Sequence, residues 1–179
     1  MRPTMRLFKH ATWMACIALL TACSPPAPDS LEKMANGNIV EVRGLNTDHI
    51  TFVTRNRIVT LFATDAYNIM REMKRYYPQE FNSHPILSVQ AVTELQNQDG
   101  EVFRNQPLFT VHWRRPDLNQ MDLDSKFNLD TEEILLYADR VESHSVVGDQ
   151  VLIEHCTVTG NGGKRERFCN QVIEGLFNK

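Results

Sequence analysis

The stretch that decides the fold is IVTLFATDAYNIMREMKRYYP, residues 58–78. Its apolar residues recur every three or four positions, which is the spacing of one face of an α-helix. They are Ile58, Phe62, Ala66, Ile69, Met70, Met73 and Tyr77. Pro78 follows directly and ends the pattern, because proline lacks the backbone N–H that a helix interior requires. We therefore expect a long amphipathic helix here, whose apolar face the rest of the domain must cover.

Short runs typical of β-strands lie on both sides of this helix. Residues 39–42 and 50–53 are rich in β-branched side chains and are separated by turn-forming residues. After the helix, residues 87–91 alternate between apolar and polar, and Asp99-Gly100 suits a two-residue hairpin turn. The returning run, residues 103–113, places its aromatic residues on one face. The pattern therefore predicts a hairpin that follows the helix.

The last third of the chain adds further expected elements. Pro107 interrupts the returning strand, which predicts an edge or a break there. Residues 130–141 begin like a capping box and predict a second helix, 151–158 predict a strand, and 168–177 predict a C-terminal helix. Hairpins rather than βαβ units join the expected strands, so we expect an α+β fold: a long helix on a small antiparallel sheet, with further C-terminal helices. In element order alone this resembles cystatin-like and nuclear-transport-factor-like folds.

The first 22 residues have the composition of a secretory signal peptide. Arg2, Arg6 and Lys9 form a basic start, and the apolar run at residues 11–22 is too short to span a bilayer as a helix. This run ends at Leu20-Thr21-Ala22-Cys23. A basic region, a short apolar region and small residues at its end predict export and removal of residues 1–22.

The four residues Leu20 to Cys23 resemble the lipobox of bacterial lipoproteins. That resemblance implies that Cys23 carries a diacylglycerol thioether and becomes the new N-terminus. Two or three acyl chains on one residue supply the two signals that stable anchoring needs. Ser24 rather than aspartate follows the cysteine, which by the same resemblance favours the outer membrane. The expected location is the bacterial cell envelope, lipid-anchored and facing the periplasm.

Charge and composition bound the remaining chain. Without residues 1–22, which hold three basic residues and no acidic one, 16 basic and 22 acidic residues remain, a formal net charge of −6. This balance predicts no nucleic-acid partner and no basic cluster for anionic lipid headgroups. Residues 23–36 contain three prolines and predict a partly extended tether reaching about 40 Å. Residues 37–179 are expected to form one globular domain.

Two cysteines remain besides Cys23, at positions 156 and 169. An exported protein folds in an oxidising compartment, where such a pair favours a disulfide. The segment between them holds three glycines and is flexible enough for its ends to meet. The thirteen-residue spacing resembles no zinc or redox motif. We expect Cys156 and Cys169 to be bonded and to pin the C-terminal helix to the strand at 151–158.

No catalytic or cofactor motif accompanies these features. The five histidines after the signal peptide are scattered, with no HExxH, and the chain lacks GxSxG, a P-loop and GxGxxG. We therefore expect no catalytic residue, no metal and no cofactor. The cationic patch Trp113-Arg114-Arg115 is the candidate interface, since arginine pairs well with carboxylates; solvated arginines at a strand end are the plainer alternative.

Three functions stay open on the sequence alone. The first is a non-enzymatic envelope lipoprotein that binds or assembles other proteins, as an accessory of a secretion or conjugation apparatus. The second is a periplasmic domain that binds a small ligand or peptide, or inhibits a partner. The third is a hydrolytic enzyme whose residues come from several loops. The absence of a catalytic motif favours the first.

Replacing Cys23 by serine should abolish lipidation, because the serine hydroxyl cannot form the thioether. Metabolic labelling with a palmitate analogue and membrane fractionation measure this. A Cys16→Ser variant, whose cysteine lies inside the discarded apolar run, should stay labelled. A Cys23→Ser chain that is still labelled and still sediments with membranes contradicts the prediction.

Overall fold

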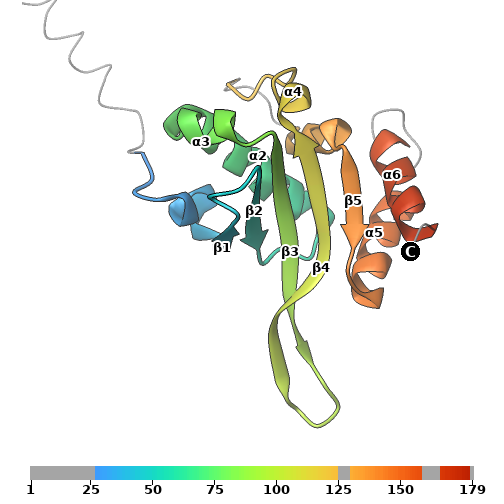
Figure 1. Ribbon diagram of the computed structural model, residues 1–179. Coiled ribbons are helices and arrows are strands. Elements are labelled where there is room, and N and C mark those ends of the chain that lie inside the picture. The colour runs from blue at the N-terminus through green and yellow to red at the C-terminus, as the bar shows by residue number, and fades with distance from the viewer. Residues whose placement is uncertain (1–26, 125–129, 159–165, 178–179) are drawn as a thin grey trace, which may run out of the picture.

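The computed structural model describes residues 27–124, 130–158 and 166–177 (Figure 1). Its strands are β1 (Ile39–Arg43), β2 (His49–Thr54), β3 (Ile86–Gln96), β4 (Val102–Arg114) and β5 (Arg140–Ser143). Its α-helices are α2 (Val59–Tyr76), α3 (Pro78–Ser83), α4 (Arg115–Leu118), α5 (Val146–Val158) and α6 (Glu166–Phe177). Its 3₁₀ helices are η1 (Leu31–Lys33), η2 (Ala35–Gly37) and η3 (Thr131–Tyr137). The expected α+β class is confirmed.

The five strands form one sheet in the order β1-β2-β3-β4-β5. The sheet is mixed, and the expectation of an antiparallel sheet is wrong at one pairing. β2 and β3 run parallel, whereas the other neighbours are antiparallel. Helix α2 lies between these two strands in the chain and returns the chain to the end of the sheet at which β2 began. β3 therefore starts at the same end as β2, which is what a parallel pair requires.

Helix α2 covers one face of the sheet, and this contact forms the core. The helix matches the expected range within one residue at each end. The ring of Phe62 meets that of Phe109 on β4 edge-on, with centroids 4.9 Å apart. The buried residues of the helix are Val59, Phe62, Ala63, Asp65, Ala66, Tyr67, Ile69, Met70 and Met73. In Figure 1 the helix lies behind the strands. The opposite face carries polar side chains, among them His49, Ser88 and His112.

The hairpin of β3 and β4 projects as an arm below the rest of the sheet in Figure 1. Its turn is longer than the two residues expected: the Asn97 side chain accepts hydrogen bonds from the backbone N–H of Asp99 and Glu101. β5 pairs with β4 only from Phe109 onward. Pro107 therefore lies where β4 has β3 as its one described neighbour, as the edge prediction required.

The segment before β1 is folded onto the domain instead of being extended. Leu31, Met34 and Ala35 are buried in the core. The hydroxyl of Tyr77 donates a hydrogen bond to the carbonyl of Pro28 at 2.5 Å. Most of the described part of the expected tether, residues 27–36, is thus packed against α2, because its few apolar residues have a surface to cover.

Two expected elements near the C-terminus differ from the structure. Residues 151–158 were expected as a strand but belong to helix α5. Their β-branched side chains resemble a strand locally, yet Leu152 and His155 face the core at helical spacing. Residues 130–141 were expected as one helix but form η3 and then β5. Ala138 is extended there, and this break lets the following residues join the sheet.

Gly148 fixes how closely α5 can approach the sheet. A Cβ at this position would overlap the backbone carbonyl of Leu108 on β4. Gly148→Ala should therefore lower the free energy of unfolding by about 1–3 kcal/mol, as overpacking does. Gln150→Ala, at an exposed site of the same helix, should change it by no more than about 0.5 kcal/mol. Urea unfolding measures both, and equal effects would contradict a close approach at Gly148.

Candidate functional site

The Trp113-Arg114-Arg115 patch does not come together on the surface. Trp113 is fully buried, and its indole N–H donates to the carbonyl of Ile134 on η3 at 2.9 Å. A buried tryptophan cannot contact a partner, so its place in the candidate interface is corrected. The reason lies in strand parity: Trp113 shares a face with Val111 and Phe109, and that face lies against α2.

The two arginines after Trp113 have partners within the domain. Arg114 Nε lies 3.0 Å from Asp139 Oδ1, and Arg115 donates to the backbone carbonyl of Asn82. Exposed ion pairs of this kind contribute little to stability. Both arginines therefore fit the alternative of a strand end with solvated charges better than that of a binding patch.

The polar face of the sheet brings together histidines that are far apart in the sequence. His49 on β2 and His112 on β4 are both bonded to Ser88 on β3: the serine Oγ lies 2.5 Å from His49 Nε2 and 2.7 Å from His112 Nδ1. The other ring nitrogen of His112 lies 3.4 Å from Glu142 Oε2. One assignment of protons satisfies both hydrogen bonds of Ser88. His49 Nε2–H donates to the serine Oγ, and the serine O–H donates to His112 Nδ1. The remaining proton of His112 is then on Nε2, which faces Glu142.

Burial of its ring keeps His112 neutral near pH 7. Burial lowers the pKa of His112 to about 4, although the carboxylate of Glu142 acts in the opposite direction. Burial also lowers the pKa of His49, and the nearby Arg140 adds to that effect. Charging either ring would place an imidazolium beside the other, since the two centroids are only 5.4 Å apart.

Ser88, His112 and Glu142 follow one another in the order of a nucleophilic triad, although only Ser88 and His112 are hydrogen-bonded and Glu142 lies 3.4 Å from His112. Ser88 is fully buried in the middle of a strand, and His112 is 5% exposed. The two rings use the proton of the Ser88 hydroxyl and one of its two lone pairs. A substrate carbonyl has no approach to this oxygen, so the row acts as a structural network across β2 to β5.

No group of three or more histidine, cysteine, aspartate or glutamate side chains is arranged to hold a metal ion in residues 27–124, 130–158 and 166–177. Within these same ranges, no helix combines the length and the apolar character needed to cross a bilayer. Cys23, the expected lipidation site, lies outside the described residues.

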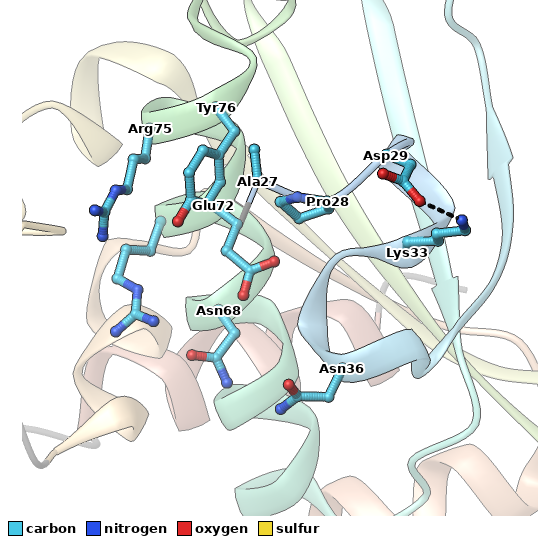
Figure 2. Close-up of a pocket in the computed structure, with 10 residues that line it drawn as sticks. Ala27, Pro28, Asp29, Lys33, Asn36, Asn68, Glu72, Arg75 and Tyr76 are labelled. Carbon is cyan, nitrogen blue, oxygen red and sulfur yellow. Dashed lines mark hydrogen bonds and ion pairs between the residues drawn. The ribbon is translucent and has the colours of Figure 1, made fainter. Parts of the chain in front are cut away.

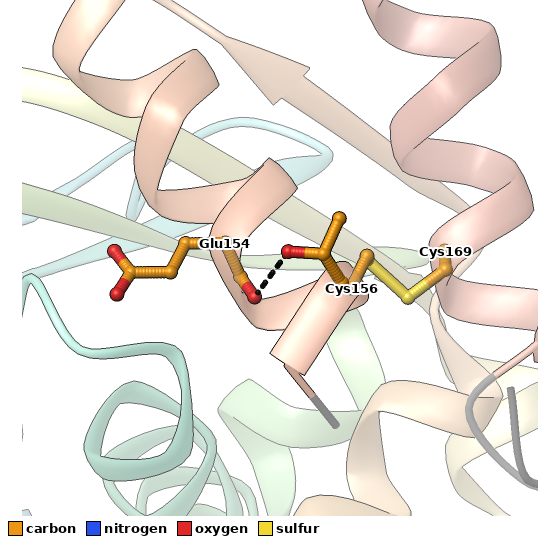
Figure 3. The surroundings of a disulfide bond; sticks show 4 residues. Glu154, Cys156 and Cys169 are labelled. Atoms are coloured by element: carbon orange, nitrogen blue, oxygen red, sulfur yellow. Dashed lines mark hydrogen bonds between the residues drawn. A yellow bond between two sulfur atoms is a disulfide. The ribbon is translucent and has the colours of Figure 1, made fainter. Parts of the chain in front are cut away.

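Cys156 on α5 and Cys169 on α6 lie at disulfide distance, with Cα atoms 5.6 Å apart (Figure 3). The expected pairing is confirmed, but it joins two helices, since residues 151–158 are not a strand. His155 is buried beside the bridge and meets the ring of Phe168 edge-on at 6.0 Å. The bridge therefore fixes α5 and α6 to each other at the β5 side of the sheet.

An apolar groove of about 450 Å³ lies over this bridge. Its apolar walls are Ile153 and Cys156 of α5 and Cys169, Val172, Ile173 and Leu176 of α6, and the polar residues Thr157, Glu166 and Asn170 complete the lining. Ile153 and Ile173 are 48% and 49% exposed. Apolar surfaces of this kind, left uncovered on a folded domain, mark contact sites for proteins or membranes.

The sequence of α5 supports the same conclusion. Seven of its thirteen residues are apolar and lie on every side of the helix, namely Val146, Val147, Val151, Leu152, Ile153, Cys156 and Val158. A helix that is apolar all round is normally buried all round. Here Leu152 is buried in the core and Val147, Val151 and Cys156 pack partly against it, whereas Ile153 is 48% exposed and Val146 and Val158 are more than 70% exposed. The outer side of α5 therefore has the composition of a contact surface.

Acidic side chains surround this surface. Over their described residues, α5 and α6 carry Asp149, Glu154, Glu166 and Glu174 against a single basic residue, Arg167. Glu166 lines the groove itself. We call the groove and the exposed apolar residues of these helices the α5–α6 surface; the described residues of the two helices carry a net negative charge.

No protein-family model, no curated protein and no solved structure matches this chain. The loose analogy with cystatin-like and nuclear-transport-factor-like folds therefore has no support from a matching structure.

Sequence reasoning missed the α5–α6 surface, although a signal was present. The expectation of a strand at 151–158 assigned alternate residues to opposite faces and so concealed that apolar residues surround the segment. The histidine row was also missed, because its members come from four strands and no local spacing connects them.

Acidification should destabilise the domain through His112. Its pKa is lower in the folded chain than the usual 6.5, so the unfolded chain binds more protons between pH 6.5 and 4. Folding stability due to this group is complete above pH 6.5 and is lost as the pH falls toward 4, on the order of 3 kcal/mol. His112→Gln should flatten this part of the stability profile, measured by urea unfolding at several pH values.

The matched variant for this test is Glu142→Gln, which removes the neighbouring carboxylate and keeps the histidine. It should retain the loss of stability on acidification, because burial is the main cause of the lowered pKa of His112. Identical profiles for the natural chain and His112→Gln would show that His112 does not cause the effect.

Proposed function

We propose that this protein is a non-enzymatic envelope lipoprotein, held by acyl chains on Cys23, whose α5–α6 surface binds another envelope protein. The observation that carries the proposal is the exposed apolar groove over the Cys156–Cys169 bridge. The lipobox resemblance of Leu20 to Cys23 supports the anchor. The burial of Ser88 and His112 supports binding over catalysis, because this triad-like arrangement is closed to substrate.

The proposed occupant of the groove is an amphipathic helix with basic flanks. Two helices that hold an apolar cleft between them suit the helix-in-groove mode of recognition. The acidic residues of α5 and α6 favour a partner with lysine or arginine beside its apolar face. The same acidic charge opposes contact with anionic lipid, and it opposes pairing with a second copy of the same surface.

The disulfide contributes by keeping the groove formed before the partner arrives. Without the bridge, α5 and α6 are joined by the chain and by packing at Phe168 and Val172. A cleft fixed in its bound shape loses less conformational entropy on binding. Reduction of the bridge leaves the apolar residues of the surface unchanged. It is nevertheless expected to weaken binding, because the groove is then no longer held in its bound shape.

Replacing Ile153 and Ile173 together by glutamine should remove the partner and leave the fold intact. Both side chains are about half exposed, so the change is expected to alter stability little, whereas apolar anchors in a groove can each contribute 2 kcal/mol or more to binding. The matched control is Leu45→Gln with Leu61→Gln, two apolar residues with 46% and 49% exposure elsewhere on the domain.

The measurement is photocrosslinking in intact envelopes, with a photoreactive residue at position 157, which lines the groove. The crosslinked segment, mapped by mass spectrometry, should be an amphipathic helix carrying lysine or arginine. This crosslink should disappear in the variant with Ile153→Gln and Ile173→Gln. It should persist in the variant with Leu45→Gln and Leu61→Gln. A crosslink to lipid or to a second copy, or one unaffected by the isoleucine changes, would overturn the proposed occupant.

A further inference from the structure

A second groove lies on the opposite side of the domain, between the N-terminal segment and α2 (Figure 2). Its volume is about 490 Å³, and its walls include Ala27, Asn36, Asn68, Arg71, Arg75 and Tyr76. In contrast to the α5–α6 surface, its walls carry cationic and amide side chains. We call it the N-terminal groove.

Two arginines of α2 give this groove its character. Arg71 and Arg75 are one helical turn apart, so they lie on the same side of α2. The guanidinium of Arg71 lies over the ring of Tyr67 at 6.0 Å, and that of Arg75 lies over Tyr76 at 5.1 Å. Stacking on an aromatic face orients a guanidinium and leaves its N–H groups free to bind an anion.

The acidic residues of the groove are already used by other groups. Asp29 pairs with Lys33 at 2.6 Å, which lowers the pKa of that carboxyl group. Glu72 accepts the backbone N–H of Ala35 at 3.1 Å. Neither Arg71 nor Arg75 forms an ion pair with a carboxylate anywhere in the described part of the chain. Glu72 keeps its negative charge, so the lining as a whole carries three cations, Lys33, Arg71 and Arg75, and two carboxylates, Asp29 and Glu72. The groove is thus cationic by one charge, with two guanidinium groups that no carboxylate holds directly, and guanidinium groups of this kind bind phosphate.

The position of the groove in the chain indicates where that phosphate comes from. Ala27 lines the groove and follows Cys23 by four residues, so its Cα lies within about 14 Å of the Cα of Cys23. The segment from Pro28 onward is fixed to the domain by the Tyr77 bond and by the buried Leu31 and Met34. The reach is therefore about a third of the 40 Å expected for an extended tether.

We propose that the N-terminal groove binds the phosphate of anionic phospholipid headgroups, with Arg71 and Arg75 as its ligands. This inference rests on the proposed lipidation of Cys23, which places the groove within reach of the polar layer of the bilayer, about 5–8 Å thick on each side. The asparagine amides of Asn36 and Asn68 add neutral donors to the same site. Anchor and groove together would orient the domain on the membrane.

The net charge of the chain does not oppose this local contact. Charges of the folded domain that are farther than a Debye length from the groove, about 8 Å at physiological salt, are largely screened. The sequence predicts no basic cluster because it counts the whole chain, whereas the fold brings Arg71, Arg75 and Lys33 to one groove and pairs Asp29 there with Lys33. Each arginine held at an anionic surface contributes about 1 kcal/mol, and two of them raise occupancy roughly tenfold or more.

The test uses the lipidated chain in nanodiscs, with a photoreactive residue in place of Ala27, which lines the groove and is not one of its proposed ligands. Crosslinking to phospholipid should be about tenfold higher in discs that contain phosphatidylglycerol than in discs of phosphatidylcholine alone. Arg71→Gln with Arg75→Gln should reduce it to the phosphatidylcholine level. The matched control is Arg104→Gln with Arg167→Gln, which removes the same charge from exposed sites on the hairpin arm and on α6.

Circular dichroism of each variant verifies the fold. The single changes Arg71→Gln and Arg75→Gln should each reduce crosslinking by less than the double change does. Crosslinking that is equal in the two disc types, or that falls equally in the matched control, would overturn the proposal. If the chain proves to carry no lipid, it will not be recovered with the discs. That result would overturn both the proposed anchor and this inference. Loss of the groove contact alone leaves the anchor and the α5–α6 surface standing.

Discussion

The rest of the structure depends on the packing of helix α2 across one face of the sheet. Phe62 and its neighbours on the helix bury the inner sides of β2, β3 and β4, and burial of this apolar surface is the dominant favourable term in folding. The same helix returns the chain so that β2 and β3 run parallel. Its outer side supports the N-terminal segment through Glu72 and Tyr77. One amphipathic helix thus determines the topology of the sheet and the place where the chain leaves toward Cys23.

The sheet also separates the two surfaces to which we assign contacts. The N-terminal groove lies on α2 beside the segment that precedes β1, and the α5–α6 surface lies beyond β5, as the blue and red ends of Figure 1 show. Five strands about 4.8 Å apart place the first and the last about 19 Å from each other. In the proposed function, this spacing turns the groove toward the lipid and holds the partner-binding surface away from it. The hydrogen bonds from His49 through Ser88 to His112 connect side chains of β2, β3 and β4 between the two surfaces.

Sequence patterns were reliable where one periodicity extended over many residues and weak where two competed. The helix at 58–77 has five turns of consistent spacing, and its ends were correct within a residue. Residues 151–158 are β-branched enough to resemble a strand, yet β5 already occupies that side of the sheet and Gly148 lets a helix approach β4. For Trp113, strand parity was read correctly, but the adjoining arginines were given more weight than the apolar face that it shares with Phe109. The histidine row had no local signal, because hydrogen bonds across strands leave no spacing in the sequence.

The sequence by itself determined the long helix, the α+β class and the pairing of Cys156 with Cys169, because periodicity and the chemistry of an oxidising compartment act on residue types alone. It also carries the lipobox resemblance at Cys23. The tertiary structure decided which side chains face outward. It buried Trp113 and Ser88, left Ile153 and Ile173 exposed, and paired the acids near Arg71 with other groups. Exposure and counter-charge are properties of what packs against a residue, and the sequence does not state its neighbours in space.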